Sequence, residues 1–203
     1  MSETLAPATL RTHAVTLQGE RVRLRPLTEG DWDVLLRWNN DPEVLWFTEG
    51  DDVRSRPLDQ VQRIYRGVSR QAMCFLAEVD GAPIGEGWLQ AMNERRILDE
   101  YPGRDVRRID LAIGEKRLWG QGLGTEMIRL LVRLAFEREE ADLLVCFVGG
   151  HNPRSRRAFE KAGFRLLRTV PEPDSAKTTF GYDLLLRREE YERQRDAPQE
   201  GSA

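Results

Sequence analysis

The sequence has few of the residues that usually mark metal sites or disulfides. It contains two cysteines and two histidines among 203 residues. Cys74 and Cys146 each lie in an apolar run typical of a buried strand, so we expect reduced, packed thiols rather than a disulfide or a nucleophile. His13 and His151 lie far apart in the sequence. We therefore expect neither a metal site nor a Ser-His-Asp triad.

A surplus of positive charge and long apolar runs are missing as well. The formal net charge is -3, with 31 Lys and Arg residues against 34 Asp and Glu, which argues against a nucleic-acid partner. No apolar run approaches the ~20 residues of a membrane span, and the N-terminus lacks the basic start and apolar stretch of a secretory signal. We therefore expect a cytoplasmic protein without a membrane or nucleic-acid partner.

The hydrophobic pattern predicts one mixed α/β domain. Residues 1–18 are interpreted as a loosely packed arm, 19–188 as the domain and 189–203 as a tail that starts helical. Within the domain we expect a strand, two helices, three strands, a long helix, a strand, a short helix and two strands. The strands are expected at 21–27, in a hairpin over 72–92, and at 106–114, 142–148, 164–170 and 178–186, and residues 93–105 as a polar loop.

A glycine-rich segment joins the strand 106–114 to the long helix. It reads R-x-x-G-Q-G-L-G from Arg117 to Gly124. Glycines lack Cβ atoms and let main-chain N–H groups surround a ligand, and the following helix adds the positive end of its dipole. This combination predicts a phosphate or pyrophosphate site. The spacing fits neither a Walker loop nor a dinucleotide fingerprint, and a glycine-rich turn without a ligand is the alternative.

A second motif follows the buried strand 142–148. It reads N-P-R-S-R-R-A-F-E-K-A-G-F and begins at Asn152, the expected N-cap of a short helix. Together the two motifs resemble the GNAT superfamily of N-acetyltransferases, with Arg117, Gly120 and Gly122 on the fixed positions of its Q/R-x-x-G-x-G/A signature. The resemblance spans residues 20–187.

This resemblance implies the fold, the acetyl donor and a set of binding residues. The fold is a single GNAT-type α/β domain, whose mixed, mostly antiparallel sheet has a splayed central strand pair and flanking helices. The donor is acetyl-CoA (coenzyme A), with its pyrophosphate on the loop 117–125 and its pantetheine arm along the strand before it. The cofactor-binding residues implied are Leu111, Ile113, Arg117, Gly120, Gln121, Gly122, Gly124, Thr125, Asn152, Ser155 and Phe159.

Phe159 departs from the family pattern. Many members have a tyrosine at this position, and its hydroxyl protonates the departing thiolate. Phenylalanine has no proton to give. Ser155, Tyr182 or water would then take that role, or the thiolate leaves unprotonated. Alternatively, Phe159 simply packs in the core.

A closer resemblance, to the aminoglycoside 6'-N-acetyltransferases, suggests the acceptor. The stretches EVLWFTEG, LDQVQRIYRGV and GRDVRRIDLAIG are similar to the acceptor loop, the second helix and the substrate-binding strand of those enzymes. The resemblance implies that Tyr65 stacks on the substrate and that Asp110 is the catalytic residue, which binds the reacting ammonium and accepts its proton. Alternatively, Asp110 pairs with Arg107 or Arg108.

An aminoglycoside is a polycation with sugar rings, so its site should offer carboxylates and aromatic faces. The predicted substrate-binding residues are Trp46, Tyr65, Glu86, Asp99, Glu100 and Asp110, with Glu49, Asp51 and Asp52 as a further acidic run. Trp46 as plain packing and the acidic run as an ordinary solvated loop are the alternatives.

Two other functions remain open. One is a GNAT enzyme that acylates a protein N-terminus or a hydroxylysine-type amine of a siderophore, and the other is a non-catalytic CoA-binding module. A protein N-terminus or a siderophore amine needs less negative charge in its site than an aminoglycoside does. Gathering of Asp99, Glu100, Asp110 and the acids of 49–52 around one cavity would therefore favour the aminoglycoside. We expect a small polyamine-type acceptor and a monomer or homodimer.

Overall fold

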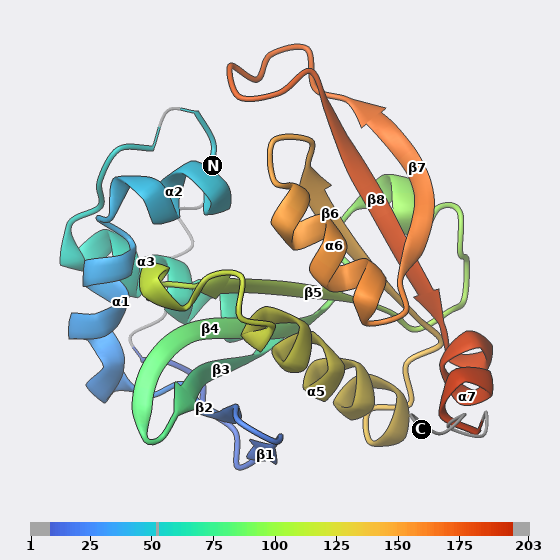
Figure 1. Cartoon of the computed structure of the whole chain (residues 1–203), viewed down its shortest axis with the longest axis horizontal. Helices are drawn as coiled ribbons and strands as arrows, with labels where there is room; N and C mark the ends of the chain where they lie inside the picture. The colour runs from blue at the N-terminus through green and yellow to red at the C-terminus, as the bar shows by residue number, and fades with distance from the viewer. Residues whose placement is uncertain (1–8, 52, 197–203) are drawn as a thin grey trace, which may run out of the picture.

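The computed structural model describes residues 9–51 and 53–196, which form one sheet flanked by helices (Figure 1). Its strands lie in the order β1-β2-β3-β4-β5-β6-β8-β7. Every neighbouring pair is antiparallel except β5 and β6, which are parallel. The strands are β1 Leu17–Gln18, β2 Arg23–Pro26, β3 Ala72–Val79, β4 Ala82–Ala91, β5 Val106–Ile113, β6 Leu143–Gly149, β7 Arg165–Pro171 and β8 Phe180–Arg187.

The parallel pair separates after a short contact. Residues 106–108 of β5 pair with 143–145 of β6, and beyond them the two strands diverge (Figure 1). On its other edge β5 pairs with β4 over residues 107–113. Among the described residues, no strand occupies the β6-facing edge of residues 109–113. The predicted mixed sheet with a splayed central pair is therefore confirmed.

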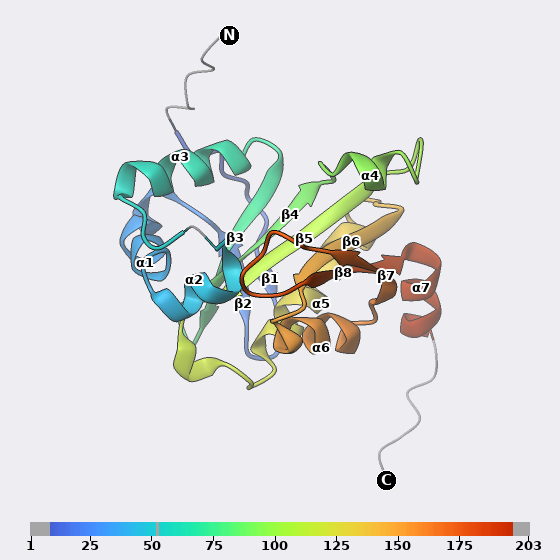
Figure 2. The ribbon, with the colours of Figure 1, turned by 90° about the horizontal axis from the view of Figure 1, so that it is seen from above.

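Helices cover both faces of the sheet (Figure 2). One face carries α5 and α6, whereas α1, α3 and α4 lie on the other. The short helix α2 lies beyond the end of β5. The helices are η1 Glu29–Asp31, α1 Trp32–Trp38, α2 Pro42–Thr48, α3 Leu58–Val68, α4 Arg95–Leu98, η2 Lys116–Leu118, α5 Leu123–Glu137, α6 Pro153–Lys161 and α7 Arg188–Asp196.

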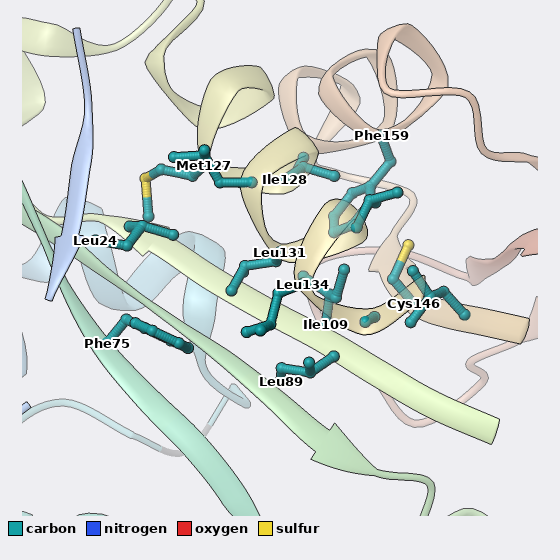
Figure 3. Close-up of a cluster of buried hydrophobic side chains, with 14 of the residues drawn as sticks. Leu24, Phe75, Leu89, Ile109, Met127, Ile128, Leu131, Leu134, Cys146 and Phe159 are labelled. Carbon is teal, nitrogen blue, oxygen red and sulfur yellow. The ribbon is translucent and has the colours of Figure 1, made fainter. Parts of the chain in front are cut away.

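The main core lies between α5 and the sheet. Leu131 and Leu134 of α5 point toward Leu89 and Ile109 on β4 and β5 (Figure 3). All four side chains are at most 1% exposed. This packing anchors α5, and with it the glycine loop at its N-terminus, against β4 and β5. A second apolar cluster, formed by α1, α3 and the opposite face of β3, fixes the other side of the sheet.

Local signals explain several of the helix boundaries. Thr28 and Asp31 form a capping box, with Thr28 N donating to the Asp31 carboxylate at 2.8 Å. Pro42 follows the end of α1 and begins α2, where Asp41 caps the new helix by accepting from Glu43 N at 2.9 Å. The acceptor-loop stretch is therefore mostly helical.

Other sequence expectations need correction. The predicted polar loop 93–105 contains α4, because Ile97 is fully buried. Residues 9–18 of the predicted arm pack on the domain: Leu10 is buried, and His13 contacts the Phe75 ring and the Cys74 carbonyl. The start of the tail forms α7, and the rest of both end segments lies outside the described residues.

Both cysteines are buried, and burial raises the pKa of the Cys74 thiol to about 12. The prediction of packed thiols is therefore confirmed. Within residues 9–51 and 53–196, no helix has the length and apolar composition needed to cross a membrane.

Candidate active site

A cleft of about 300 Å³ lies where β5 and β6 diverge. The end of β5 and the glycine loop form one side of it, and α2 and α6 contribute the rest. The divergence leaves main-chain groups of β5 unpaired, and the glycine loop brings the N-terminus of a long helix to the same place. The cleft therefore combines an open strand edge with a region of positive potential.

The glycine loop takes a conformation that few other residues adopt. Gly120 and Gly122 have φ of 79° and 83°, in the left-handed region. Gly122 is the N-cap of α5, so the first N–H groups of a 15-residue helix start at the cleft. A Cβ at Gly120 would meet no atom within 4 Å, so the backbone conformation, rather than crowding within the protein, accounts for this glycine. These features suit an anionic ligand.

Most of the residues predicted to bind the donor line this cleft. They are Leu111, Ile113, Gly120, Gly122, Gly124, Thr125, Asn152 and Ser155. Asn152 caps α6 as predicted, because its side chain accepts from Ser155 N at 3.1 Å. The Ile113 carbonyl already accepts from Trp119 Nε1 at 2.7 Å. A ligand that pairs with this carbonyl has to displace the indole.

Three of the predicted donor-binding residues lie outside the cleft lining. Arg117 and Gln121 are exposed, and the Gln121 side chain turns back to donate to the Arg117 carbonyl at 2.9 Å. Phe159 is 3% exposed and packs edge-on against Phe164, at 5.1 Å between ring centroids. Its ring faces the core beneath α6 (Figure 3), which makes core packing the correct interpretation.

The cleft takes its positive side chains from α6 instead. Arg154, Arg157 and Lys161 line it, and none of them is among the predicted site residues. Their spacing of i, i+3 and i+7 on one helix is the signal that could have found them. The Arg154 guanidinium lies over the rings of Trp119 and Phe47, at 4.2 and 4.5 Å from their centroids. It therefore links α6 to α2 across the cleft.

A second group of polar residues lies on the sheet face opposite α5. In the register of β4 and β5, Trp88 pairs with Asp110 and Gln90 with Arg108. Side chains two apart on a strand share a face, so Glu86 lies on the same face as Trp88. Asp110 accepts from Arg108 Nη2 at 2.6 Å and from Gln90 Nε2 at 2.5 Å. Asp110 therefore pairs with Arg108 rather than Arg107, and its catalytic role stays a prediction.

Glu86 is a partly buried carboxylate beside Asp110. It accepts from the Tyr65 hydroxyl at 2.5 Å and from Trp88 Nε1 at 3.0 Å. Burial raises the pKa of Glu86 to about 7, and the nearby carboxylates of Glu49 and Asp110 add to this effect, whereas the two hydrogen bonds oppose it. Glu86 therefore changes its charge near neutral pH, within the electrostatic influence of Glu49 and Asp110.

Tyr65 does not present a stacking face. It is 2% exposed, and the rings of Trp32 and Trp88 lie edge-on to it at 6.2 and 5.6 Å. Its hydroxyl accepts from Asn39 Nδ2 at 3.0 Å while it donates to Glu86. The expectation that Tyr65 stacks on a sugar is therefore wrong, because the helix buries the ring and uses its hydroxyl to hold Glu86.

The remaining predicted acids divide into two groups. Glu49 lies near enough to Glu86 to raise its pKa. Asp99 and Glu100 do not join this group: the Asp99 side chain is 65% exposed beside Arg95, and Glu100 pairs with Arg168. Their loop is held near β8 by α4, away from the end of β5.

Three other predicted residues, one in the acceptor-loop stretch and two directly after it, have separate positions. Asp51 accepts from Ala176 N at 2.5 Å. Asp52 lies outside the described residues. The Trp46 ring is 45% exposed, next to Lys177 and His151. Of the acids whose gathering would favour an aminoglycoside, only Glu49 and Asp110 lie near Glu86 in the described part of the chain.

A family model described as an acetyltransferase (GNAT) domain matches residues 21–165. The chain belongs to the GNAT acetyltransferase family. As a GNAT member it is an acetyl-CoA-dependent N-acetyltransferase. An aminoglycoside N(6')-acetyltransferase type 1 from Klebsiella pneumoniae is 30% identical over 164 residues, which cover 79% of this chain and 82% of that protein.

Solved GNAT structures share the fold. The structure of AAC(6')-Ib in complex with ribostamycin and coenzyme A superposes with a TM-score of 0.76 and 28% identity, covering 88% of this chain and 99% of that one. The spermidine N-acetyltransferase from Vibrio cholerae, in complex with CoA and spermine, has a TM-score of 0.70 at 17% identity, covering 85% and 99%. Solved relatives thus hold coenzyme A together with small amines.

Proposed function

We propose that this GNAT enzyme transfers the acetyl group of acetyl-CoA to the 6'-amine of an aminoglycoside. The observation that carries the proposal is the pair of carboxylates, Glu86 and Asp110, on adjacent strands where β5 and β6 diverge. A cationic amine needs negative charge at the point where its nitrogen meets the thioester. The similarity to aminoglycoside N(6')-acetyltransferases supports this choice of amine.

The cleft between β5 and α6 is suited to acetyl-CoA, which supplies the acetyl thioester. The N-terminus of α5 and the left-handed glycines would bind its pyrophosphate, with added charge from Arg157 and Lys161. The open edge of β5 at Leu111 would pair with the pantetheine arm, and Asn152 and Ser155 would flank the arm on the other side. The two binding regions meet at the end of β5 beside Asp110.

The proposed chemistry follows from this meeting point. Asp110 and Glu86 would hold the acceptor ammonium and take its proton, directly or through water, so that the nitrogen can attack the thioester carbonyl. A carbon–nitrogen bond forms, the carbon–sulfur bond breaks, and the sulfur leaves as a thiol once it gains a proton. Ser155 lines the cleft and is the protein hydroxyl that we propose for this proton. Tyr182 instead packs beneath Arg156, whose Cζ lies 4.2 Å from the centroid of the Tyr182 ring.

One observation favours the alternative acceptor, a protein N-terminus or a hydroxylysine-type amine. Arg108 pairs with Asp110, and Arg56 pairs with Glu49 at 2.6 Å, so much of the negative charge beside Glu86 already has a partner. A less cationic amine than an aminoglycoside fits a site of this charge.

A panel of amines separates these acceptors. CoA release is followed with acetyl-CoA and kanamycin-like and tobramycin-like aminoglycosides, spermidine or short peptides, and the acetylated nitrogen is located by NMR. We expect turnover with the aminoglycosides at the 6'-nitrogen. Turnover confined to peptides, or absent with every amine, would refute the proposed acceptor.

The role of Asp110 has a matched control in the residue that precedes the same strand. Asp110→Asn should lower kcat by roughly 10²-fold while the affinity for acetyl-CoA, measured by calorimetry, stays near that of the wild type. Asp105→Asn removes a similar pair, in which Arg107 Nη2 lies 2.8 Å from Asp105 Oδ2, and should leave kcat unchanged. Equal effects of the two substitutions would remove Asp110 from the chemistry.

A further inference from the structure

The connection between β7 and β8 reaches across the end of the splayed sheet. Residues 172–179 leave the β7–β8 ladder and extend to the side of the molecule where α2 lies (Figures 1 and 2). A hydrogen bond of 2.9 Å from Glu172 N to the Thr179 carbonyl closes the base of this loop. The loop therefore joins the half of the sheet that contains β6–β8 to the half that contains β2–β5.

One side chain makes most of this connection. Lys177 Nζ lies 3.0 Å from the carbonyl oxygens of Trp46 and Glu49, 3.4 Å from that of Gly50 and 3.5 Å from that of Leu45. These carbonyls belong to the last turn of α2 and the residues after it, where helix carbonyls carry negative partial charge; that of Leu45 also accepts from Glu49 N at 3.1 Å. An ammonium has only three N–H donors, so this group of acceptors satisfies it completely.

Neighbouring contacts reinforce the same junction. Ala176 N donates to Asp51 Oδ2 at 2.5 Å, so the loop donates a main-chain hydrogen bond as well as those of the Lys177 ammonium. The Lys177 ammonium also lies 5.1 Å from the centroid of the Trp46 ring. From the other side, His151 Nε2 lies 3.2 Å from the Trp46 carbonyl oxygen. The C-terminal half of α2 is thus held by two segments that come from beyond the splay.

This half of α2 is placed between the two binding regions. Phe47 and Thr48 line the donor cleft. Glu49, whose carbonyl is held by Lys177, has its carboxylate in the acidic group around Glu86. A movement of α2 would therefore change the wall of the acceptor site more than the donor cleft. The donor cleft is formed largely by the glycine loop and β5, which the packing of α5 on the sheet holds in place.

We propose that Lys177 is a positioning and specificity-determining residue, which fastens the loop 172–179 onto the end of α2 and so fixes the wall of the acceptor site. The proposal rests on the proposed function in one respect, the location of the acceptor beside Glu86 and Asp110. An acceptor with several rings extends from the reacting nitrogen to this wall and depends on it. A short linear amine reaches only the carboxylates and does not.

The test compares Lys177→Met, which keeps the length and apolar stem of the side chain, with Lys177→Arg, which keeps its charge. Lys116→Met is the matched control, because Lys116 pairs with Asp41 and Glu43 at the opposite end of α2. Hydrogen exchange of residues 172–179 and 45–51 measures the fastening in the free enzyme. Steady-state kinetics with kanamycin, spermidine and acetyl-CoA measure its effect on each substrate.

We expect Lys177→Met to speed exchange in both segments and to raise KM for kanamycin roughly tenfold, the effect of losing one charge-assisted hydrogen bond. KM for acetyl-CoA and for any turnover of spermidine should stay within about twofold, and Lys177→Arg should restore kanamycin binding. Unchanged exchange would overturn the fastening. Faster exchange with unchanged KM values, or with equal rises for all substrates, would leave Lys177 a merely structural role and overturn the proposal. If the wild-type enzyme acetylates no aminoglycoside, the proposed function fails and the specificity claim fails with it, whereas the exchange result still decides whether the loop is fastened.

Discussion

The substitution Glu86→Gln should destabilise the protein at pH 5 but not at pH 8. Glu86 lies in a partly buried position with its pKa raised from the ordinary 4.5 to about 7. The folded state therefore binds more protons than the unfolded state between these two values. Wild-type stability must then fall as the pH rises from about 4.5 to about 7, and it stays low above that. The penalty for the ionised carboxylate at pH 8 is about 3 kcal/mol.

The glutamine removes the penalty of the ionised carboxylate, but it also loses a hydrogen bond that Glu86 makes. Its amide oxygen can accept the Trp88 N–H, which leaves its NH2 group facing the Tyr65 hydroxyl. That hydroxyl already accepts from Asn39, and with a second donor beside it the Tyr65 O–H loses its acceptor. A buried donor without a partner costs about 1–3 kcal/mol. We therefore expect the variant to be less stable than the wild type at pH 5, and as stable or more stable at pH 8.

Urea unfolding at the two pH values measures this change. The difference in unfolding free energy between variant and wild type should shift by about 2–3 kcal/mol from pH 5 to pH 8. The half-buried imidazole of His13, whose pKa is lowered by burial, gives a pH dependence of opposite sign, but it is common to both proteins and cancels. Glu115→Gln is a control, since Glu115 also accepts a tryptophan N–H, from Trp38 at 3.1 Å, and the variant retains Glu86. Parallel pH profiles for wild type and Glu86→Gln would refute the raised pKa and the burial behind it.

Two further predictions concern the donor cleft. Arg157→Ala and Lys161→Ala should each weaken acetyl-CoA binding severalfold in calorimetry at low salt, whereas Arg117→Ala should not, because only the first two line the cleft; a loss confined to Arg117→Ala would restore the role that the family signature suggests for it. Asn152→Ala should lower the unfolding free energy by about 1 kcal/mol because Ser155 N loses its cap, and Asn152→Asp should retain it; equal unfolding curves for Asn152→Ala and the wild type would show that the cap contributes nothing.

Local signals made much of the fold predictable. The turn Asp80-Gly81 joins β3 and β4 as a hairpin, with both residues at positive φ, and the glycine loop leads into α5 as its spacing indicates. The strand pattern could not reveal α4, because only Ile97 among its four residues is buried. It could not reveal the packing of residues 9–18 either, since His13 contacts Cys74 and Phe75 more than 60 positions away. Short segments held by contacts with distant parts of the chain carry no periodic signal.

The candidate site was predictable where main-chain conformation determines it. The glycines and Asn152 are required by a loop and a cap, and both requirements are visible in the sequence. The partners of the acids are not: Tyr65 reaches Glu86 only because α3 packs over β4, 21 residues later in the chain. A family resemblance assigned Tyr65 a stacking role, but the packing of two tryptophans on its ring leaves only its hydroxyl for function.

The splay of β5 and β6 also explains why α2 influences both halves of the site. A sheet interrupted at its centre has no main-chain hydrogen bonds to transmit position across the gap. Side chains from beyond the gap replace them: Arg154 lies on Phe47, and Lys177 binds the carbonyls at the end of α2. Opening the cleft for a donor and an acceptor thus requires that these contacts, rather than the sheet, hold the two walls at a fixed separation. Substitutions at these two positions should therefore alter substrate binding while the core around α5, which is independent of them, keeps the domain folded.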